Sequence, residues 1–294
     1  MQLRFDQVTK RFGDATALDI PSLTIHPGEF FSFVGPAGAG KSTALRLIAG
    51  VEAPSAGTLA LGDRVLDSAD GVSSDVRVVP TDAVLRPGEQ PVSLFDDPLV
   101  ELDASERSVT REKLKKLHQE LGTTFVYATE DQEEALALSD RIAVLHEGQI
   151  HQVGTPSAVC DHPRTTAVAS FFGSPPMNIV AGILEKDGAA VQIGPRSIQL
   201  NGAVQQTYFR DVFLGIRPEH VRLRDGSTAG WKAKVSSVTP ADNGTAIAVT
   251  VDMGAFVARE EGEVRYKVGD TVLLTLPRKQ LHLFDQRGLR LDIV

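Results

Sequence analysis

Short apolar runs and segments with helical periodicity alternate along the first half of the chain. Residues 29–34 and 92–97 are dominated by apolar side chains, the second run ending in two carboxylates, and residues 123–128 form a third such run. Runs of this length are typical of strands buried on both faces of a sheet. Residues 44–49 read as a helix, and the segment 102–121 carries leucines three and four positions apart, as on one helix face. This order predicts an α/β fold.

The second half has a different pattern. Helical periodicity ends at a Pro-rich stretch, residues 173–178, and short segments of alternating apolar and polar residues follow. Asp242-Asn243-Gly244 is a strong hairpin signal between two of them. An all-β barrel or sandwich is therefore expected after the α/β part. The expected boundaries are an α/β domain at 1–172, a linker at 173–180 and a β-domain at 181–294.

Composition narrows the class of protein. The formal net charge is −8, which argues against nucleic acid held by bulk electrostatics. The single cysteine, Cys160, cannot form an internal disulfide, so a reducing compartment is expected, and little supports it as a nucleophile. No apolar stretch approaches the roughly 18 residues of a membrane-spanning helix, and the seven histidines are scattered. We expect a cytoplasmic protein without a dedicated His or Cys metal site.

A glycine-rich loop joins the first apolar run to the following helix. It has the spacing G-x-x-x-x-G-K-[ST], which cradles phosphates when it lies between a strand and a helix. Backbone N–H groups close around the phosphates, Lys41 supplies a positive charge to the terminal phosphates, and Ser42 offers a hydroxyl to Mg²⁺. The predicted nucleotide-binding residues of the loop are Gly35, Pro36, Ala37, Gly38, Ala39, Gly40, Lys41, Ser42 and Thr43.

Two carboxylates end the apolar run at residues 92–97. An acid at the end of a buried strand beside the loop can hold Mg²⁺ through its water shell, which makes Asp96 the predicted Mg²⁺ acid. Asp97 is the candidate group that polarises the attacking water. Asp-Asp-Pro is also common in an ordinary turn after a strand. The two carboxylates therefore indicate a nucleotide site only together with the glycine-rich loop.

Two other positions are candidates for a structural or a binding role. Phe12 lies at a turn after the first strand and either stacks on a base or plugs the strand end as a hydrophobic side chain. Asp103, with Glu106 three positions later, is placed to cap the helix that follows.

Several further segments, taken together, resemble one family. They are Val8-Thr9-Lys10 with Phe12, the loop Gly35 to Thr43, Leu94 to Leu99 with Leu102-Asp103-Ala104, Asp131 to Ala135, Asp140 to Leu145, Phe172 to Pro175, Leu214 to His220 and His282-Leu283-Phe284. This set resembles the ATP-binding subunits of bacterial ABC importers of the sugar type, which carry a C-terminal regulatory β-domain of the TOBE or OB-like kind. The resemblance implies a P-loop ATPase core, ATP and Mg²⁺ as ligands, base stacking by Phe12, and a D-loop role for Asp103.

The chain departs from that family at four places. The helical subdomain with its L-S-G-G-Q signature is missing, and residues 79–92 bridge the gap. The family's V-F-Q segment is Val78-Val79-Pro80 or, one residue later, Val79-Pro80-Thr81, so its glutamine is absent. The catalytic glutamate of the family is Asp97, one methylene shorter. At the position of the family's switch histidine, this chain has Glu130. Its carboxylate either repels the γ-phosphate, by about 1–4 kcal/mol at ~4 Å, or points to water beside a helix N-terminus.

These departures argue against ATP hydrolysis more strongly than against ATP binding. In the family, each ATP is bound between the P-loop of one subunit and the signature segment of the other. Two copies of this chain cannot form such a site, because neither has the signature. We therefore expect a nucleotide-binding subunit with weak or lost hydrolysis, with a non-catalytic regulatory or structural module acting through its β-domain as the alternative. Pairing with itself or with a complete ABC subunit remains open, permease docking is doubtful without the helical subdomain, and an unrelated P-loop kinase or GTPase is disfavoured.

Overall fold

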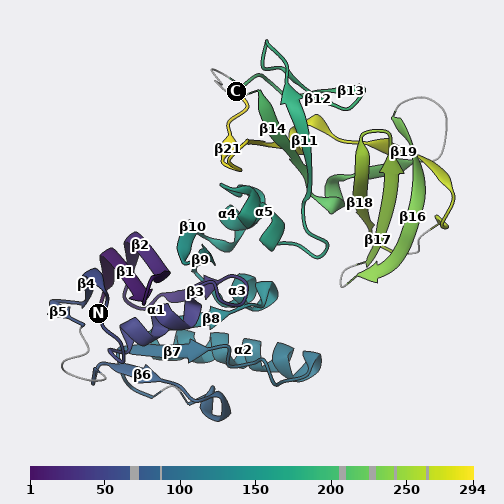
Figure 1. Ribbon diagram of the computed structural model, residues 1–294. Helices are drawn as coiled ribbons and strands as arrows, with labels where there is room; N and C mark the ends of the chain where they lie inside the picture. The colour runs from purple at the N-terminus through teal and green to yellow at the C-terminus, as the bar shows by residue number, and fades with distance from the viewer. Residues whose placement is uncertain (67–72, 87, 205–209, 225–229, 242–243, 263–264) are drawn as a thin grey trace. The chain divides into compact units, whose positions relative to one another are not determined.

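The structure of the chain, a computed structural model, describes residues 1–66, 73–86, 88–204, 210–224, 230–241, 244–262 and 265–294. These residues form two compact units, Met1–His162 and Pro163–Val294, each with its own hydrophobic core (Figure 1). Across the described ranges, no helix combines the length and the apolar character that crossing a membrane requires.

The first unit is built on one ten-stranded sheet, with strand order β5-β4-β1-β2-β10-β9-β3-β8-β7-β6. Its strands are β1 (Leu3–Phe12), β2 (Ala15–Ile25), β3 (Phe30–Val34), β4 (Ala56–Leu61), β5 (Arg64–Val65), β6 (Val76–Val78), β7 (Val92–Asp96), β8 (Thr124–Thr129), β9 (Arg141–His146) and β10 (Gln149–Gly154). Its helices are α1 (Lys41–Ile48), α2 (Ala104–Leu121), α3 (Gln132–Leu138) and α4 (Pro156–Asp161). The strands β9, β3, β8, β7 and β6 run parallel, as the sequence of alternating strands and helices predicts.

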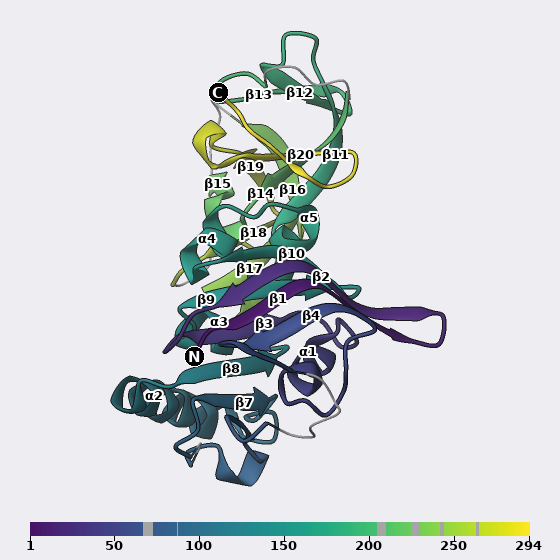
Figure 2. The same cartoon turned by 90° about the vertical axis from the view of Figure 1, so that its left-hand side faces the viewer.

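Alternate side chains of the parallel strands pack against helices on opposite faces of the sheet. Phe31 and Phe33 of β3 belong to one cluster with the apolar residues of α1. Phe30 of β3 belongs to another, with Leu114 of α2 and Leu138 of α3. Figure 2 shows β3, β8 and β7 lying between α1 and α2. Because both faces are covered, these strands are mostly apolar, and their carboxyl ends meet at one edge of the sheet.

The second unit consists of two antiparallel sheets that enclose a shared core. One sheet has the order β13-β12-β11-β14-β20-β21, from β11 (Asn178–Leu184), β12 (Ala190–Ile193), β13 (Arg196–Gln199), β14 (Asp211–Ile216), β20 (His282–Asp285) and β21 (Arg290–Leu291). The other has the order β15-β19-β16-β17-β18, from β15 (Arg222–Arg224), β16 (Trp231–Ala241), β17 (Gly244–Val251), β18 (Gly254–Glu260) and β19 (Thr271–Thr275). Helix α5 (Thr166–Phe171) contributes Ala169 to a smaller cluster with Met177 and Phe284.

The expected fold class, an α/β core followed by an all-β unit, is confirmed. The alternating segments of the sequence predict strands at 180–184, 190–193, 212–216, 231–238, 245–251, 271–276 and 281–284, which correspond to β11, β12, β14, β16, β17, β19 and β20. Strands β13, β15, β18 and β21 were not predicted. The predicted hairpin turn at Asp242-Asn243-Gly244 falls partly on residues 242–243, which lie outside the described residues. The strands on either side of it, β16 and β17, pair antiparallel up to Ala241 and Gly244.

Candidate functional site

The glycine-rich loop leaves β3 and enters α1 in a conformation that depends on its glycines. A Cβ atom at Gly35 would overlap the carbonyl oxygen of Leu145 on β9. Gly40, the residue before α1, has φ of 102°, and a Cβ there would come within 2.7 Å of the Ala17 carbonyl oxygen. Only glycine adopts this backbone without a steric penalty. The spacing therefore has the structural context, strand then loop then helix, that the sequence predicted.

Lys41 is the first residue of α1, and its ammonium group turns back over the loop. The Nζ atom donates hydrogen bonds to the carbonyl oxygens of Gly35 at 2.8 Å and Pro36 at 2.9 Å. A third contact is with the carboxylate of Glu130, 3.3 Å away. Only 7% of the side chain is exposed. Three acceptors thus hold a buried cation over the glycine-rich loop, at the N-terminus of α1.

Glu130 follows the last residue of β8 and faces the loop. Its side chain is about half exposed, 49%, and its Oε1 atom pairs with the ammonium group of Lys41. The two interpretations open in the sequence were repulsion of a phosphate and a carboxylate that simply points to water. The structure shows Glu130 paired with Lys41, a contact that neither interpretation included. The two residues are 89 positions apart in the sequence.

Ser42 and Asp96 lie side by side at the edge of the sheet. The Ser42 hydroxyl donates a hydrogen bond to Asp96 Oδ1 at 3.1 Å. A hydroxyl and a carboxylate are the hard oxygen ligands that Mg²⁺ takes when nucleotide phosphates and water complete its shell. Among the described residues, no cluster of three or more His, Cys, Asp or Glu side chains forms a dedicated metal site. The oxygen atoms of Ser42 and Asp96 fit a Mg²⁺ ion whose other ligands are phosphate and water oxygens.

Asp97 follows β7 in a left-handed backbone conformation, with φ of 46°. Its N–H donates to the carbonyl oxygen of Ala128 at 2.8 Å, and its Oδ1 atom accepts from the hydroxyl of Thr129 at 3.0 Å. Burial raises the pKa of the Asp97 carboxyl, and Glu130 and Asp96 add to the rise, while the Thr129 hydrogen bond and Lys41 oppose it. A carboxylate held in this way is fixed beside the loop and is a stronger base than a solvated aspartate.

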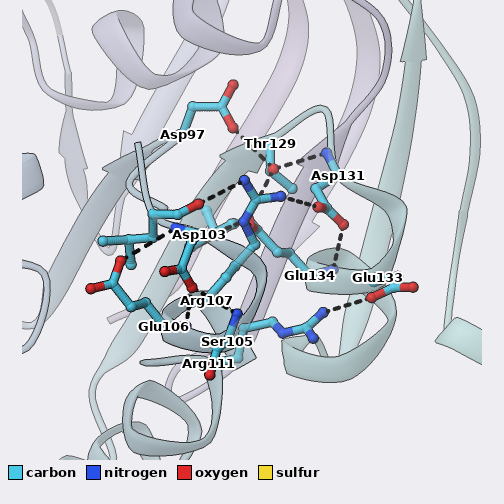
Figure 3. Close-up of polar contacts among 12 residues, drawn as sticks. Asp97, Asp103, Ser105, Glu106, Arg107, Arg111, Thr129, Asp131, Glu133 and Glu134 are labelled. Atoms are coloured by element: carbon cyan, nitrogen blue, oxygen red, sulfur yellow. Dashed lines mark hydrogen bonds and ion pairs between the residues drawn. The ribbon is translucent and has the colours of Figure 1, made fainter. Parts of the chain in front are cut away.

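Thr129 connects Asp97 to a buried polar cluster that the sequence reasoning missed (Figure 3). Its Oγ1 atom accepts from the backbone N–H of Asp131 at 3.0 Å and lies 3.1 Å from Glu134 Oε2. The hydroxyl has one proton for two carboxylates, Asp97 and Glu134. Tyr127 also donates to Glu134 Oε2, at 2.6 Å. The only sequence signal was the position of Thr129 at the carboxyl end of a buried strand.

Burial dominates the electrostatics of this cluster. Glu134 is 2% exposed, and burial raises the pKa of its carboxyl with a further rise from Asp131. Hydrogen bonds from Tyr127 and Thr129 and the charge of Arg107 oppose that rise. The Arg107 guanidinium donates to Asp131 Oδ2 at 3.0 Å and lies 3.7 Å from Glu134. The start of α2 is thereby tied to the start of α3.

Asp103 caps α2 in the geometry that its spacing to Glu106 predicts. Its Oδ1 atom accepts from the N–H groups of Ser105 and Glu106, both at 2.9 Å, and Glu106 Oε2 accepts from the N–H of Asp103 at 3.3 Å (Figure 3). The capping interpretation is confirmed. Within the described residues, no hydrogen bond or ion pair links Asp103 to Lys41, Ser42, Asp96 or Glu130.

Phe12, the last residue of β1, lies apart from the carboxylates. Its side chain is 50% exposed, and the ammonium group of Lys10 lies 5.1 Å from the ring centroid. A ring that plugged the strand end would be buried. The ring is half exposed and has the Lys10 ammonium group over one face, so stacking on a base stays a prediction.

The segment between β6 and β7 is short. Val79 is buried, and its N–H donates to Leu94 at 2.9 Å, whereas Pro80 and Thr81 are exposed. In the described part of this segment, which omits residue 87, the only helical element is one 3₁₀ turn, Thr81–Ala83. A helical subdomain is therefore missing at this position, as the sequence indicated, and the sequence contains no L-S-G-G-Q.

Comparison with protein families gives three matches along the chain. Residues 18–153 match the ABC transporter family, residues 173–221 match the MalK OB fold domain, and residues 214–284 match the TOBE domain. The first match contains the glycine-rich loop and the carboxylates, and the other two lie in the second unit.

Individual relatives match over nearly the whole chain. SmoE of Agrobacterium fabrum, a sulfoquinovosyl glycerol transport ATP-binding protein, is 30% identical over 343 positions, with 95% of this chain and 96% of SmoE covered. XacK of Haloferax volcanii, a xylose/arabinose import ATP-binding protein, is 33% identical, with 97% and 93% covered. UgpC of Escherichia coli O157:H7, an sn-glycerol-3-phosphate import ATP-binding protein, is 32% identical, with 96% and 97% covered. The 343 positions exceed the 294 residues of this chain, so the match to SmoE includes residues with no counterpart here.

Proposed function

The chain belongs to the ATP-binding subunits of ABC transporters, and we propose that it binds ATP with Mg²⁺ at the loop Gly35 to Thr43 and hydrolyses it weakly or not at all. The observation that carries the binding half of this proposal is the geometry of Lys41, a buried ammonium group held at the N-terminus of α1. A helix N-terminus with converging backbone N–H groups and one fixed cation is a phosphate site.

The residues around the loop have distinct roles in this proposal. Lys41 contacts the terminal phosphates, and the Ser42 hydroxyl and Asp96 carboxylate hold Mg²⁺, which neutralises charge on the phosphates. The exposed ring of Phe12 stacks on the adenine. Asp97 is the candidate that orients the attacking water, and Asp103 is the D-loop residue that faces a second subunit.

Several features support weak or lost hydrolysis. The signature segment that stabilises the transferring phosphoryl group from the partner subunit is not in the sequence. Pro80 and Thr81 stand where a glutamine is expected, and Asp97 is one methylene shorter than glutamate. A misplacement of a catalytic group near 1 Å can cost about 100-fold in rate. Glu130 adds a carboxylate that competes with phosphate for Lys41.

The transported solute is proposed from relatives. Three proteins that are similar to this chain are named for sulfoquinovosyl glycerol, xylose/arabinose and sn-glycerol-3-phosphate. Together with the OB and TOBE matches, these names support a subunit of an importer for sugars or related solutes, acting at the cytoplasmic face of a membrane through a permease and a second ATP-binding subunit. The proposed organisation is a nucleotide-binding domain at 1–172, a linker at 173–180 and a regulatory β-domain at 181–294. The compact units divide earlier, after His162, and the OB fold match begins at residue 173.

A binding measurement tests the proposal. ATP–Mg²⁺ should raise the midpoint of thermal unfolding, and Lys41→Ala should remove most of this rise. Charge-assisted hydrogen bonds contribute about 1.5–3 kcal/mol each, so the affinity should fall at least tenfold. Lys113→Ala, an exposed lysine of α2, is the matched control and should bind like the wild type. Equal protection of the wild type and of Lys41→Ala would reject binding at the loop.

The absent signature favours a second candidate function, a non-catalytic module that acts through its β-domain or through a complete ABC subunit. In such a pair, the complete partner's signature closes on Lys41 and its loop, while the partner's own loop faces no signature. Co-purification of the tagged chain with an importer permease favours the transport role. A chain that neither retains a permease nor gains stability from ATP favours the structural role.

A further inference from the structure

Two histidines face each other across the hairpin of β9 and β10. The ring centroids of His146 and His151 are 5.5 Å apart, and the two ring planes are nearly perpendicular, at 87°. His146 is the last residue of β9, and His151 lies in β10, on the other side of the turn. Both residues are partly exposed. The function proposed for the glycine-rich loop uses neither of them.

The pairing of the two strands places both histidines on one face of the hairpin. Leu145 of β9 pairs with Ile150 of β10, and both pack into the core cluster that contains α1. His146 and His151 come one position later on their strands, so their side chains point to the opposite face. His151 is also the extra residue of a β-bulge, because the register passes from Ile150 to Gln152. Such bulges redirect a side chain and are frequent beside functional sites.

The turn between the two strands is anchored by its backbone. The N–H of Gly148 donates to the carbonyl oxygen of Ala39 at 3.1 Å, and the carbonyl oxygen of Gly148 accepts from the N–H of Asp19 at 2.7 Å. Glu147 and Gly148 have φ of 49° and 77°, the left-handed values of a tight two-residue hairpin turn. The strands on either side are thereby held in position, and two ligands on rigid elements keep a defined separation.

The separation and the chemistry of the pair indicate a metal ion as ligand. An imidazole nitrogen lies about 2.0–2.1 Å from a bound zinc ion, so two rings that share one tetrahedral ion have centroids roughly 5 Å apart. The observed 5.5 Å is close to this value. Rotation of the two partly exposed rings about their side-chain bonds would direct one nitrogen of each at a shared ion. Imidazole suits Zn²⁺, Cu²⁺ and Ni²⁺, whereas Mg²⁺ prefers oxygen ligands.

We propose that His146 and His151 together bind one divalent transition-metal ion. Among the described residues, no group of three or more His, Cys, Asp or Glu side chains could hold a metal ion, so the pair supplies the protein ligands and water supplies the others. A site of this kind exchanges its ion with solvent, unlike a structural zinc site with four protein ligands. The site does not depend on the nucleotide binding proposed for the glycine-rich loop.

Calorimetric titration of the full, untagged chain with zinc chloride, in the absence of nucleotide, tests the proposal. We expect the affinity for zinc to fall at least tenfold in His146→Gln and in His151→Gln, because each variant loses one of two ligands. The combined loss in the double variant should be smaller than the product of the single losses, since either change already breaks the pair. His26→Gln, an exposed histidine of the same unit, is the matched control and should bind zinc like the wild type.

Two further titrations distinguish this site from the oxygen ligands beside the loop. Zinc binding should survive Asp96→Asn and should be unchanged in excess Mg²⁺. Equal zinc affinity in the wild type, His146→Gln and His151→Gln would overturn the proposal. Loss of zinc binding in Asp96→Asn, with binding kept in both histidine variants, would overturn it as well, as would displacement of zinc by Mg²⁺. Each histidine variant decides the test alone if circular dichroism shows that the other is unfolded.

Discussion

The ammonium group of Lys41 and the carboxylate of Glu130 form an ion pair at 3.3 Å. Lys41 also donates to two carbonyl oxygens of its own loop. A phosphate that takes Lys41 as its partner must displace the Glu130 carboxylate and then lie near its negative charge. We therefore expect Glu130 to oppose the nucleotide binding that is proposed for Lys41.

Glu130→Gln is expected to increase the affinity for ATP–Mg²⁺. Because Glu130 is about half exposed, solvent screens its charge, and the gain should be near the lower end of the Coulomb range, about 1 kcal/mol. This corresponds to roughly fivefold in Kd. Titration with a fluorescent ATP analogue measures it, and the gain should shrink at high salt.

Glu133→Gln provides the matched control for that variant. Glu133 is exposed on α3 and pairs with Arg111 instead of Lys41. Its removal should leave the Kd for nucleotide unchanged. Equal Kd values for the wild type and Glu130→Gln would show that Glu130 does not compete for Lys41.

Asp103 is expected to contribute to stability through the capping box of α2. Asp103→Ala should lower the free energy of unfolding by about 1 kcal/mol, whereas Asp103→Asn, which still accepts from the helix N–H groups, should retain most of it. Urea unfolding followed by circular dichroism measures both variants. Equal losses in the two would mean that the charge of Asp103, and not its capping hydrogen bonds, supplies the stabilisation.

Glu134 is expected to make stability depend on pH. Burial raises the pKa of its carboxyl above 4.5, so protonated Glu134 stabilises the folded chain, and this contribution is lost as pH rises through the raised pKa. The neutral Glu134→Gln variant lacks this loss. Its free energy of unfolding, relative to the wild type, should therefore increase from acidic pH to neutrality. Urea unfolding at both pH values checks the sign, and a relative decrease would show that Arg107 and the hydrogen bonds outweigh burial.

The sequence predicted those parts of the site that depend on local spacing. The loop Gly35 to Thr43, the carboxylates at the end of β7 and the capping pair of Asp103 are each set by residues a few positions apart. The Lys41–Glu130 pair joins residues 89 positions apart, and Thr129 reaches Asp97 across two neighbouring strands. Such contacts follow from the order of strands in the sheet, which periodicity alone does not define.

The strands of the second unit that were not predicted also depend on contacts between residues far apart in the sequence. β15 and β21 are two or three residues long and rich in arginine, and β13 has one buried apolar side chain, Ile198. They carry too little apolar alternation to be recognised alone. Each becomes a strand by pairing with a neighbour, β15 with β19 and β21 with β20.

Steady-state ATP hydrolysis by the purified chain, compared with Lys41→Ala, tests the central claim most directly. The claim is that the loop binds ATP while the groups that complete catalysis are shortened, replaced or missing. The predicted result is phosphate release by the wild type no faster than by Lys41→Ala, under conditions where the wild type is saturated with ATP–Mg²⁺. Turnover at the roughly 1 s⁻¹ or more that is common for enzymes, abolished by Lys41→Ala, would contradict it.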